Sequence, residues 1–380
     1  LFAEMGPRRA VQQEGDPIDV ASIHPLYQFP QNIPRPLLTT YENRLGWLYN
    51  REFAIAPIID WGWLGGVGMV AELERYWSKT YVGDQFSFTC HGWRNLFAIQ
   101  EPVYRELSVE FFSTVCFEER TLDFTYNRAL VFRLGGVYRE CSLREFAWRM
   151  GLYTEVETQS LFFIPFLLGC VRDFAPGTLD VQFWRGISNH EYNTRDSSES
   201  QIRNPVFRFL HRLITFSINH KHHGDKVPIQ NLFYLWTLIT PGVCCDLPYM
   251  LARFMGKKAA NSRPGSPITG GHLVTRLARS YQILNHDFVR NLTRFPDTDL
   301  TIQVLGVMRA VVNIGGRFVI PPIDDEQEEV QPGQQPPARP RRRNVRARGE
   351  VERERAASQY VQGVPTDPFQ SRVGTYLDNL

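Results

Sequence analysis

The clearest structural signal in the chain lies in residues 128–153, RALVFRLGGVYRECSLREFAWRMGLY. The segments before and after Gly135 and Gly136 are short and rich in β-forming side chains. Two glycines between two such segments are typical of a hairpin whose two-residue turn needs left-handed backbone. This part of the sequence therefore predicts a β-hairpin.

A helix is predicted directly after the hairpin. Ser142 offers its hydroxyl to the first helical N–H groups, and Glu145 three residues later completes a capping box. Gly151 permits the left-handed end of the helix. The apolar residues between them share one helical face: Leu143, Phe146, Ala147 and Met150.

Residues 204–226, NPVFRFLHRLITFSINHKHHGDK, predict a second helix and a basic loop. Asn204 is the expected cap, and Pro205 suits the first helical position. The apolar stripe consists of Val206, Phe207, Leu210, Leu213, Ile214 and Ile218. The opposite, wetter face is expected to carry Arg208, His211, Arg212 and Thr215.

Two more helices complete the prediction for the second half of the chain. IQNLFYLWTLI, residues 229–239, follows Pro228 and is apolar nearly all round, which indicates a buried helix. Residues 272–284 place Leu273, Leu277, Ala278 and Leu284 on one face, with Arg276 and Arg279 on the wetter side. The expected fold class is mainly α, with one or a few small β-hairpins.

Composition divides the chain into three parts. Residues 1–45 are rich in Pro, Gln and charge, which predicts an extended, poorly ordered arm. Residues 46–320 have a globular composition. Residues 321–380 combine an acidic run with an Arg- and Pro-rich run and predict a disordered tail.

Charge is distributed unevenly along the chain. Residues 1–202 carry 18 Lys/Arg against 25 Asp/Glu, a net charge of −7, whereas residues 203–286 carry 11 Lys/Arg against two Asp, a net charge of +9. This asymmetry suggests an anionic partner for the basic part, or contact between the acidic and basic parts of different copies. Two oppositely charged surfaces of one domain, or an acidic subdomain (46–202) and a basic one (203–320), also fit it.

The location expected from the sequence is the cytoplasm or the nucleus. The six cysteines contain no CxxC pair, and the first twenty residues are too charged for a signal peptide. The longest apolar run, residues 161–171, is interrupted by Pro165 and is shorter than the roughly 20 residues of a spanning helix. No membrane partner is therefore expected.

A metal site is the first chemical alternative. His220, His222 and His223, with Cys244 and Cys245 further along, supply suitable ligand types. Adjacent side chains tend to point apart, however, while zinc needs ligands that converge tetrahedrally from separate elements. A solvated loop is the favoured interpretation, and neither a metal nor another cofactor is expected.

Enzyme motifs are weak. GVGMVA at residues 66–71 matches the GxGxxA pattern through Gly66 and Gly68, but Asp60–Trp63 separate it from the preceding apolar run. A P-loop, a GxSxG elbow and an aspartic-protease triplet are missing from the sequence, so we expect no catalytic residues and no small-molecule substrate.

Nucleic-acid binding through charge is the favoured interaction, because phosphate neutralisation needs clustered Arg and Lys. The basic span supplies candidates with almost no acidic neighbours, and the tail adds six arginines. The candidates are Arg203, Arg208, Arg212, Lys221, Lys226, Arg253, Lys257, Lys258, Arg263, Arg339, Arg341, Arg342, Arg343, Arg346 and Arg348.

A series of motifs in fixed order resembles the plant Athila-type first-reading-frame protein of gypsy-class long-terminal-repeat retrotransposons, which occupies the gag position. The motifs are YRELSVEFFSTV (104–115), VFRLGGVYRECSLREFAWRMGLY (131–153), FW (183–184), IRNPVFRFLHRLITFSI (202–218), IQNLFYLWTLI (229–239), LPYMLARFM (247–255), ITGGHLVTRLARSYQI (268–283) and a PDTDL…GRFVIPP ending (296–322). The series covers about residues 45–322.

The resemblance implies a structural protein encoded by a transposable element and brings no catalytic residues. This chain lacks the zinc knuckle, the protease triplet and the polymerase motif of a full polyprotein. The leading expectation is thus a helical, gag-like protein that self-associates and contacts element RNA through charge. Two alternatives remain open: a host nuclear protein-interaction module, and a Rossmann-like or metal-dependent enzyme.

Overall fold

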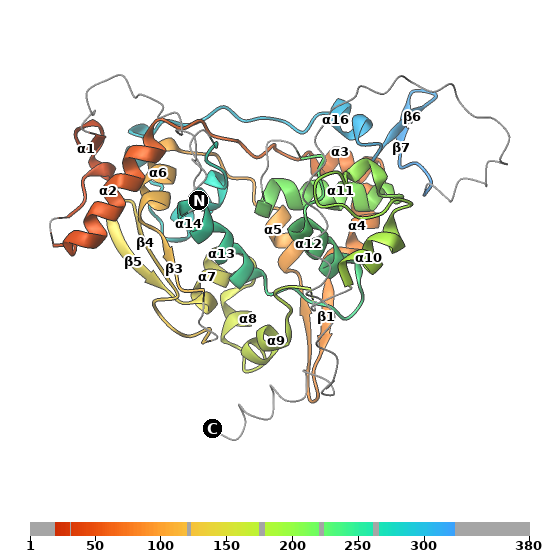
Figure 1. Ribbon diagram of the computed structural model, residues 1–380, viewed down its shortest axis with the longest axis horizontal. Helices are drawn as coiled ribbons and strands as arrows, with labels where there is room; N and C mark the ends of the chain where they lie inside the picture. The colour runs from red at the N-terminus through yellow and green to blue at the C-terminus, as the bar shows by residue number, and fades with distance from the viewer. Residues whose placement is uncertain are drawn as a thin grey trace, which may run out of the picture. The chain divides into compact units, whose positions relative to one another are not determined.

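The computed structural model describes residues 20–30, 32–119, 123–174, 179–219, 224–260 and 266–323, all within one compact unit that spans Leu1–Gln327. Helices predominate among them, which confirms the predicted mainly α fold class, and the strands form small antiparallel sheets (Figure 1). The predicted tail lies outside the described residues from Asp324 onward.

The helices and helical turns are α1 (Val20–Ile23), η1 (Pro25–Tyr27), α2 (Arg35–Tyr49), α3 (Trp61–Gly66), α4 (Met69–Trp77), α5 (Gly92–Phe97), α6 (Arg105–Thr114), α7 (Leu143–Arg149), α8 (Glu155–Gln159), α9 (Phe163–Gly169), α10 (Leu179–Ile187), η2 (Glu199–Gln201), α11 (Pro205–Ile214), η3 (Thr215–Asn219), α12 (Ile229–Ile239), α13 (Leu247–Ala260), α14 (Gly271–Ser280), α15 (His286–Arg290) and α16 (Ile302–Val307). The strands are β1 (Lys79–Val82), β2 (Ser87–Cys90), β3 (Cys116–Phe117), β4 (Leu130–Leu134), β5 (Val137–Cys141), β6 (Val312–Ile314) and β7 (Arg317–Val319). They pair as β1–β2, β3–β4–β5 and β6–β7.

The predicted hairpin forms between β4 and β5. Gly135 and Gly136 have φ angles of +65° and +80°, the left-handed backbone that the turn requires. The turn pairs Leu134 with Val137 and sets the register of both strands. The prediction from this segment is confirmed.

The helix that follows, α7, begins at the predicted Ser142 cap and ends before the predicted glycine, but the reciprocal Glu145 bond of the predicted capping box does not form. The Ser142 hydroxyl accepts a hydrogen bond from the Glu145 N–H at 3.1 Å, and Gly151 has a φ of +74°. The Glu145 carboxylate pairs with Arg149 one turn later. The predicted apolar face is buried, since Leu143, Phe146, Ala147 and Met150 have no exposed surface.

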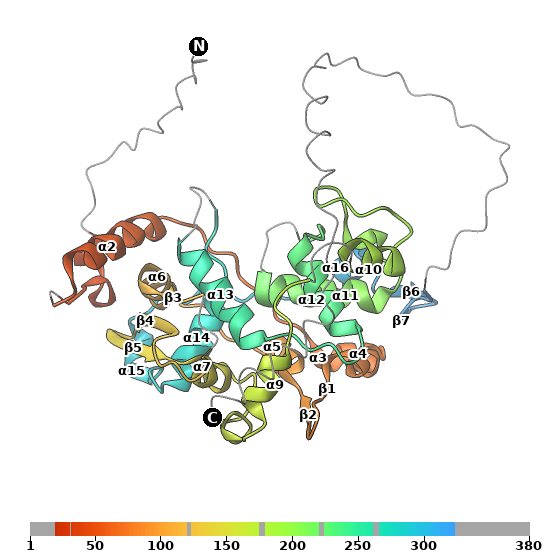
Figure 2. The same cartoon turned by 60° about the horizontal axis from the view of Figure 1, so that its bottom comes forward.

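Helix α6 is the buried centre around which one group of elements packs. It contacts α2, β4, α13 and α14, and every residue from Glu106 to Thr114 is buried (Figures 1 and 2). The buried side chains include Glu110, whose carboxylate accepts hydrogen bonds from the Gly135 and Gly136 N–H groups at 2.8 Å each. Arg133 places its Nε 3.3 Å from the same carboxylate. The turn of the hairpin is therefore attached directly to the central helix.

The N-terminal segment differs from the prediction. The expected extended arm over residues 1–45 is wrong from Val20 onward, because α1, η1 and α2 fold there; residues 1–19 lie outside the described residues. Tyr41, Leu45 and Leu48 of α2 are buried, and their spacing of four and three is helical. The prediction of an extended arm gave weight to the proline content of this segment and overlooked that short apolar pattern.

A second group of elements contains α4, α10, α11 and α12. The predicted helices at 205–218 and 229–239 form here: Asn204 caps α11 by accepting from the Val206 N–H at 2.8 Å, and α12 is buried as expected. The expected wet face of α11 is wrong, because Arg208, His211 and Thr215 are all at most 1% exposed.

Acidic and basic parts of the sequence interleave in space. Helix α6, from the acidic segment, packs against α13 and α14 from the basic segment, while α11 and α12 contact α4 and α10. Residues 46–202 and 203–320 therefore do not form the separate acidic and basic subdomains that the charge split suggested.

The β1–β2 hairpin packs against α9 through aromatic rings. Phe88 stacks on Phe166 with ring centroids 4.5 Å apart, and Tyr81 meets the same ring edge-on at 5.8 Å. Gly169 is required at the end of α9, because an added Cβ would lie 2.2 Å from the Tyr81 hydroxyl. The close approach of these two elements thus depends on a residue without a side chain.

Replacing Glu110 with alanine should destabilise the fold, because the N–H groups of the hairpin turn and the buried Arg133 lose their acceptor. Burial raises the pKa of Glu110 to about 7, against the lowering effect of Arg133 and the two glycine N–H groups. Since the folded pKa lies above the unfolded one, the wild type loses stability as the pH rises towards 7. The loss in free energy of unfolding should be about 3 kcal/mol at pH 5 and smaller at pH 8.

Denaturant titrations at both pH values measure this difference. Glu72→Ala is the control, because the Glu72–Arg75 pair is exposed and contributes little. A loss for Glu110→Ala that grew with pH would contradict the assignment of a raised pKa.

Candidate functional site

The candidate nucleic-acid-binding residues divide first by whether the structure describes them. Eight of the fifteen lie outside the described residues: Lys221, Arg263, Arg339, Arg341, Arg342, Arg343, Arg346 and Arg348. His220, His222 and His223 of the metal hypothesis lie outside them as well. The remaining seven candidates have defined positions.

Arg208 belongs to the core. It is 1% exposed, and its guanidinium donates to the carbonyls of Ile202 at 2.5 Å and of Arg203 and Arg309 at 3.1 Å each. These bonds tie α11 to the segment before it and to the loop after α16. The assignment of Arg208 to nucleic acid is therefore wrong, because a phosphate cannot reach a buried guanidinium whose donors are already used.

Arg212 takes part in a buried polar cluster. Its guanidinium pairs with the Glu199 carboxylate, which also lies 3.4 Å from Nδ1 of His211. The other ring nitrogen of His211, Nε2, is 3.1 Å from Nδ2 of Asn231, and Asn231 also donates to the Thr215 hydroxyl at 3.0 Å. The cluster joins η2, α11 and α12.

This cluster has the elements of a carboxylate–histidine pair, yet its chemistry is structural. Both nitrogens of the His211 ring have protein partners, and the residue is completely buried. A general base needs a free nitrogen within reach of substrate. The sequence placed His211 on a wet face, and only the packing of α12 and η2 against α11 explains its burial.

Five candidates keep contact with solvent: Arg203, Lys226, Arg253, Lys257 and Lys258. They form two groups. Arg203 and Lys226 lie near η2, where they donate to the carbonyls of Gly186 at 2.7 Å and of Asp196 at 3.4 Å. The other three lie on the last turns of α13.

The α13 group faces a carboxylate that the sequence did not single out. Arg253 and Lys257 both pair with Glu119, and the Lys258 ammonium lies 5.6 Å from the centre of the Phe254 ring. Desolvation tends to raise the pKa of Glu119, but Arg253 and Lys257 outweigh it, so the pKa is lowered and the carboxylate stays charged. One acidic side chain therefore offsets part of this basic surface.

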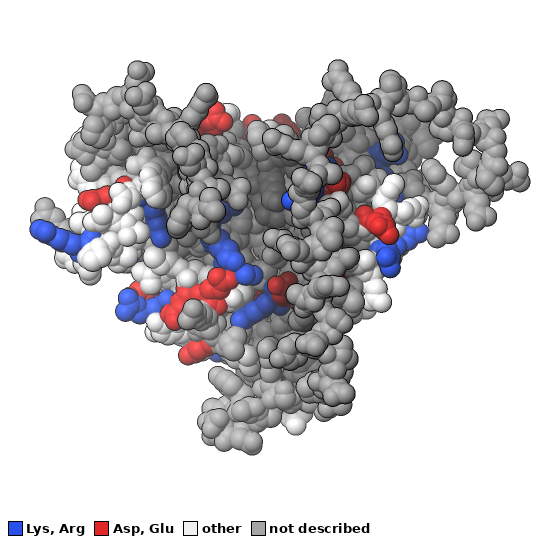
Figure 3. Space-filling view, viewed as in Figure 1, with Lys and Arg blue, Asp and Glu red and all other residues white. Residues whose placement is uncertain are grey.

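Ion pairs between the two charged segments are a general feature of the described residues. They join Glu101 to Arg276 and Arg279, Arg172 to Asp246, Glu119 to Arg253 and Lys257, and Glu199 to Arg212. On the face in Figure 3, Lys and Arg side chains lie beside Asp and Glu side chains. Much of the charge asymmetry of the sequence is thus balanced within the folded unit.

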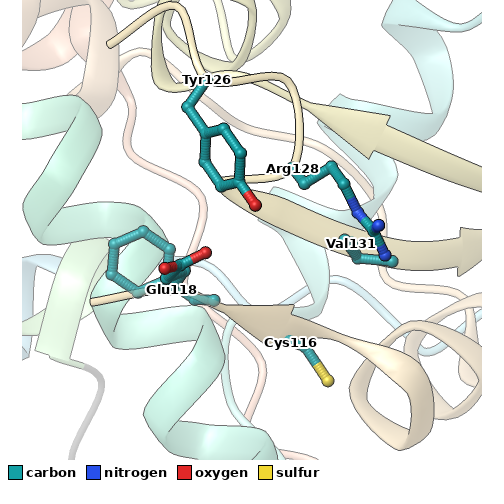
Figure 4. Close-up of a pocket in the computed structure, with 6 residues that line it drawn as sticks. Cys116, Glu118, Tyr126, Arg128 and Val131 are labelled. Atoms are coloured by element: carbon teal, nitrogen blue, oxygen red, sulfur yellow. The ribbon is translucent and has the colours of Figure 1, made fainter. Parts of the chain in front are cut away.

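A shallow pocket lies beside β3 and the start of β4. It has a volume of about 260 Å³ and is lined by Cys116, Phe117, Glu118, Tyr126, Arg128 and Val131 (Figure 4). Arg128 pairs with Glu140, its Nε 3.1 Å from the carboxylate. Arg128, the one Lys or Arg in the lining, is therefore already paired with a carboxylate on β5.

The glycine motif at residues 66–71 lies between two helices. Gly66 ends α3, and Gly68 adopts a left-handed φ of +80° before α4. A dinucleotide site needs this motif between a strand and a helix. Cys244 and Cys245 of the metal hypothesis are both buried; among the described residues, no group of three or more potential ligands is arranged to hold a metal.

The most conspicuous surface in the described part of the chain is apolar and lies on α8, α9 and the β1–β2 turn. Its exposed side chains are Val82 (75%), Val156 (81%), Leu161 (89%), Phe162 (49%) and Leu168 (44%). Phe162 stacks on Phe86 of the β1–β2 turn with ring centroids 5.2 Å apart, which links α9 to that turn. Leu161 lies in the turn just before α9, and Leu168 lies in its last turn. Exposed apolar groups that gather in this way mark interaction sites more often than isolated ones do.

None of the described helices combines the length and apolar composition needed to cross a bilayer. Comparison of the chain with models of known protein families, with curated proteins and with solved structures finds no match.

Substituting Arg208 with alanine should lower the free energy of unfolding by about 3 kcal/mol, because three buried carbonyl groups lose their charged donor. Arg203→Ala, which removes a partly exposed side chain, should cost less than about 1 kcal/mol. Chemical denaturation measures both. If Arg208→Ala left the stability unchanged and weakened RNA binding, Arg208 would be a binding residue and not a core residue.

Proposed function

We propose that the chain is a non-enzymatic structural protein of the gag-like class, which self-associates and binds RNA through charge. The resemblance described above supports this proposal, and its motifs correspond to central elements of the fold. Residues 104–115 form α6, residues 131–153 include the β4–β5 hairpin and α7, and residues 229–239 form α12. The core polar groups Glu110 and His211 are engaged by protein partners, as suits a scaffold.

RNA binding would use the cations that remain in contact with solvent. Arg203 and Lys226 near η2 and the α13 group (Arg253, Lys257 and Lys258) are candidates in the folded part. The six tail arginines between Arg339 and Arg348 form the densest run of positive charge in the sequence. Because Glu119 and Glu199 offset cations of the folded part, the tail is expected to contribute most of the affinity.

The apolar surface on α8, α9 and the β1–β2 turn is the observation that carries the self-association proposal. We assign a second copy of the chain as its occupant. Acidic side chains of Asp84 and Glu155 lie at exposed positions beside this surface, and Lys257 of the α13 group is an exposed cation that could meet them. A contact between two different surfaces of identical copies is head-to-tail and extends into larger assemblies.

RNA affinity should depend steeply on salt. If the six tail arginines each meet a phosphate, the slope of log affinity against log salt concentration should be about −4 from this segment. Replacing all six (Arg339, Arg341, Arg342, Arg343, Arg346 and Arg348) with glutamine should remove that part of the slope. Fluorescence anisotropy with a labelled single-stranded RNA measures it.

Arg353→Gln with Arg355→Gln is the control, because these arginines alternate with glutamates in the same tail. An identical slope for the wild type and the six-fold variant would refute tail-mediated binding. A wild type that binds specific proteins but no RNA would favour a protein-interaction module instead.

Self-association should depend on the apolar surface. Val156→Glu combined with Leu161→Glu places two charges in the proposed contact, and each lost apolar contact should weaken association about tenfold. Light scattering at tens of micromolar should show oligomers for the wild type and monomers for the double variant. Val307→Glu is the control, because Val307 is 84% exposed on α16, away from these elements in the sequence. A strictly monomeric wild type would end the self-association proposal.

A further inference from the structure

Two segments far apart in the sequence pair side by side in parallel, at the end of α9 and before α13. The Val171 N–H donates to the Cys244 carbonyl at 2.8 Å, and the Asp246 N–H donates to the Val171 carbonyl at 3.0 Å. These two bonds place Val171 opposite Cys245. In a parallel pair, the residues on either side are then opposite each other as well. Cys170 therefore faces Cys244, and Arg172 faces Asp246.

The second of these pairs verifies the register. Nε of Arg172 lies 2.8 Å from Oδ2 of Asp246, so side chains at these positions do meet across the two segments. Side chains alternate between the two faces of an extended segment. Cys170 and Cys244 consequently lie on the same face as the ion pair, while Cys245 points to the other face.

The spacing suits a covalent bond between the two sulfur atoms. Neighbouring extended segments lie about 4.8 Å apart, within the Cα–Cα range of roughly 4.4–6.8 Å found in disulfides. The Cys170 and Cys244 side chains interact directly, and both cysteines are free thiols in the structure. A bond between them needs little backbone movement.

A buried cation lies beside the pair. Lys79 is 8% exposed, donates to the Thr240 carbonyl at 3.0 Å and interacts electrostatically with Cys244. The Cys170 thiol lowers the pKa of Cys244, burial opposes this effect, and the Lys79 ammonium adds to the lowering. Desolvation raises the pKa of Cys170. The two sulfurs thus differ: Cys244 loses its proton more readily than Cys170, and the thiolate is the form that reacts with oxidants.

We propose that Cys170 and Cys244 are a redox-active pair that a hydroperoxide oxidises to an intrachain disulfide. The Cys244 thiolate attacks the outer peroxide oxygen, the O–O bond breaks, and an alcohol (or water, from hydrogen peroxide) leaves after taking up a proton. The product is a sulfenic acid on Cys244. The Cys170 sulfur then displaces hydroxide from it, and hydroxide leaves as water with the Cys170 proton. Two thiols lose two electrons in total, and the hydroperoxide gains them.

The bond would link the end of α9 to the start of α13 and close a loop through residues 171–243. Closing a long loop restricts the unfolded chain, so the oxidised protein should unfold at a higher temperature than the reduced one. The bond would also restrain Leu168 and the rest of α9, which carries part of the apolar surface. This inference does not depend on RNA binding or on self-association.

The test treats the fully reduced, full-length chain with a small excess of hydrogen peroxide. Counting thiols in denaturant should show that two of the six are lost. Tryptic mapping without reductant should then join the peptides of residues 150–172 and 227–253. Cys170→Ser should stop at the sulfenic acid, which dimedone labels on Cys244, and Cys244→Ser should lose no thiols at the wild-type rate.

Cys245→Ser is the matched control, because Cys245 occupies the same peptide but the opposite face. It should form the same cross-link as the wild type. Recovery of both peptides without a cross-link, or a cross-link that joins Cys244 to Cys90 or to another chain, would overturn the proposal. If the serine variants do not fold, fragmentation of the cross-linked wild-type peptides decides this alone, because it separates Cys244 from Cys245.

Discussion

The fold depends on one buried carboxylate. Glu110 on the central helix α6 accepts hydrogen bonds from the N–H groups of Gly135 and Gly136 and pairs with Arg133. A buried charge is tolerable only when such partners surround it, so the helix and the hairpin turn must be present together. The Glu110 cluster positions the β3–β4–β5 sheet against α6, and α2, α13 and α14 pack around the same helix. The sheet and the surrounding helices are therefore all held in place by contacts with α6.

Ion pairs within the folded chain reduce the positive charge that is accessible to a ligand. A segment with a net charge of +9 invites the interpretation of a basic binding surface, yet several of its cations pair with carboxylates of the other segment in the folded chain. Arg208 is the extreme case, because its guanidinium serves three backbone carbonyls in the core. The proposed binding of RNA would then rely on the cations that remain accessible and on the arginine run of residues 339–348, which contains no carboxylate.

Helix α9 brings two different kinds of chemistry close together. Leu161 in the turn before it and Leu168 in its last turn are exposed to solvent, and Cys170 follows its C-terminal end opposite Cys244. The aromatic contacts of Phe88 and Tyr81 with Phe166 hold this short helix against β1 and β2, and Gly169 permits the close approach. If the proposed self-association and the proposed disulfide both hold, α9 offers a physical route by which oxidation would influence association.

The sequence by itself determined the elements whose causes are local. Gly135 and Gly136 predict the hairpin because few other residues adopt its backbone angles, and Ser142 and Asn204 predict helix starts because their side chains bond nearby N–H groups. The apolar faces of α7 and α12 follow from periodicity alone. Tertiary structure decided that the polar face of α11 is buried. The loop after α16 covers Arg208, and α12 covers His211. Tertiary structure also decided which charges pair and which two cysteines meet. These outcomes depend on contacts between residues as much as 178 positions apart, and no local pattern encodes such a meeting.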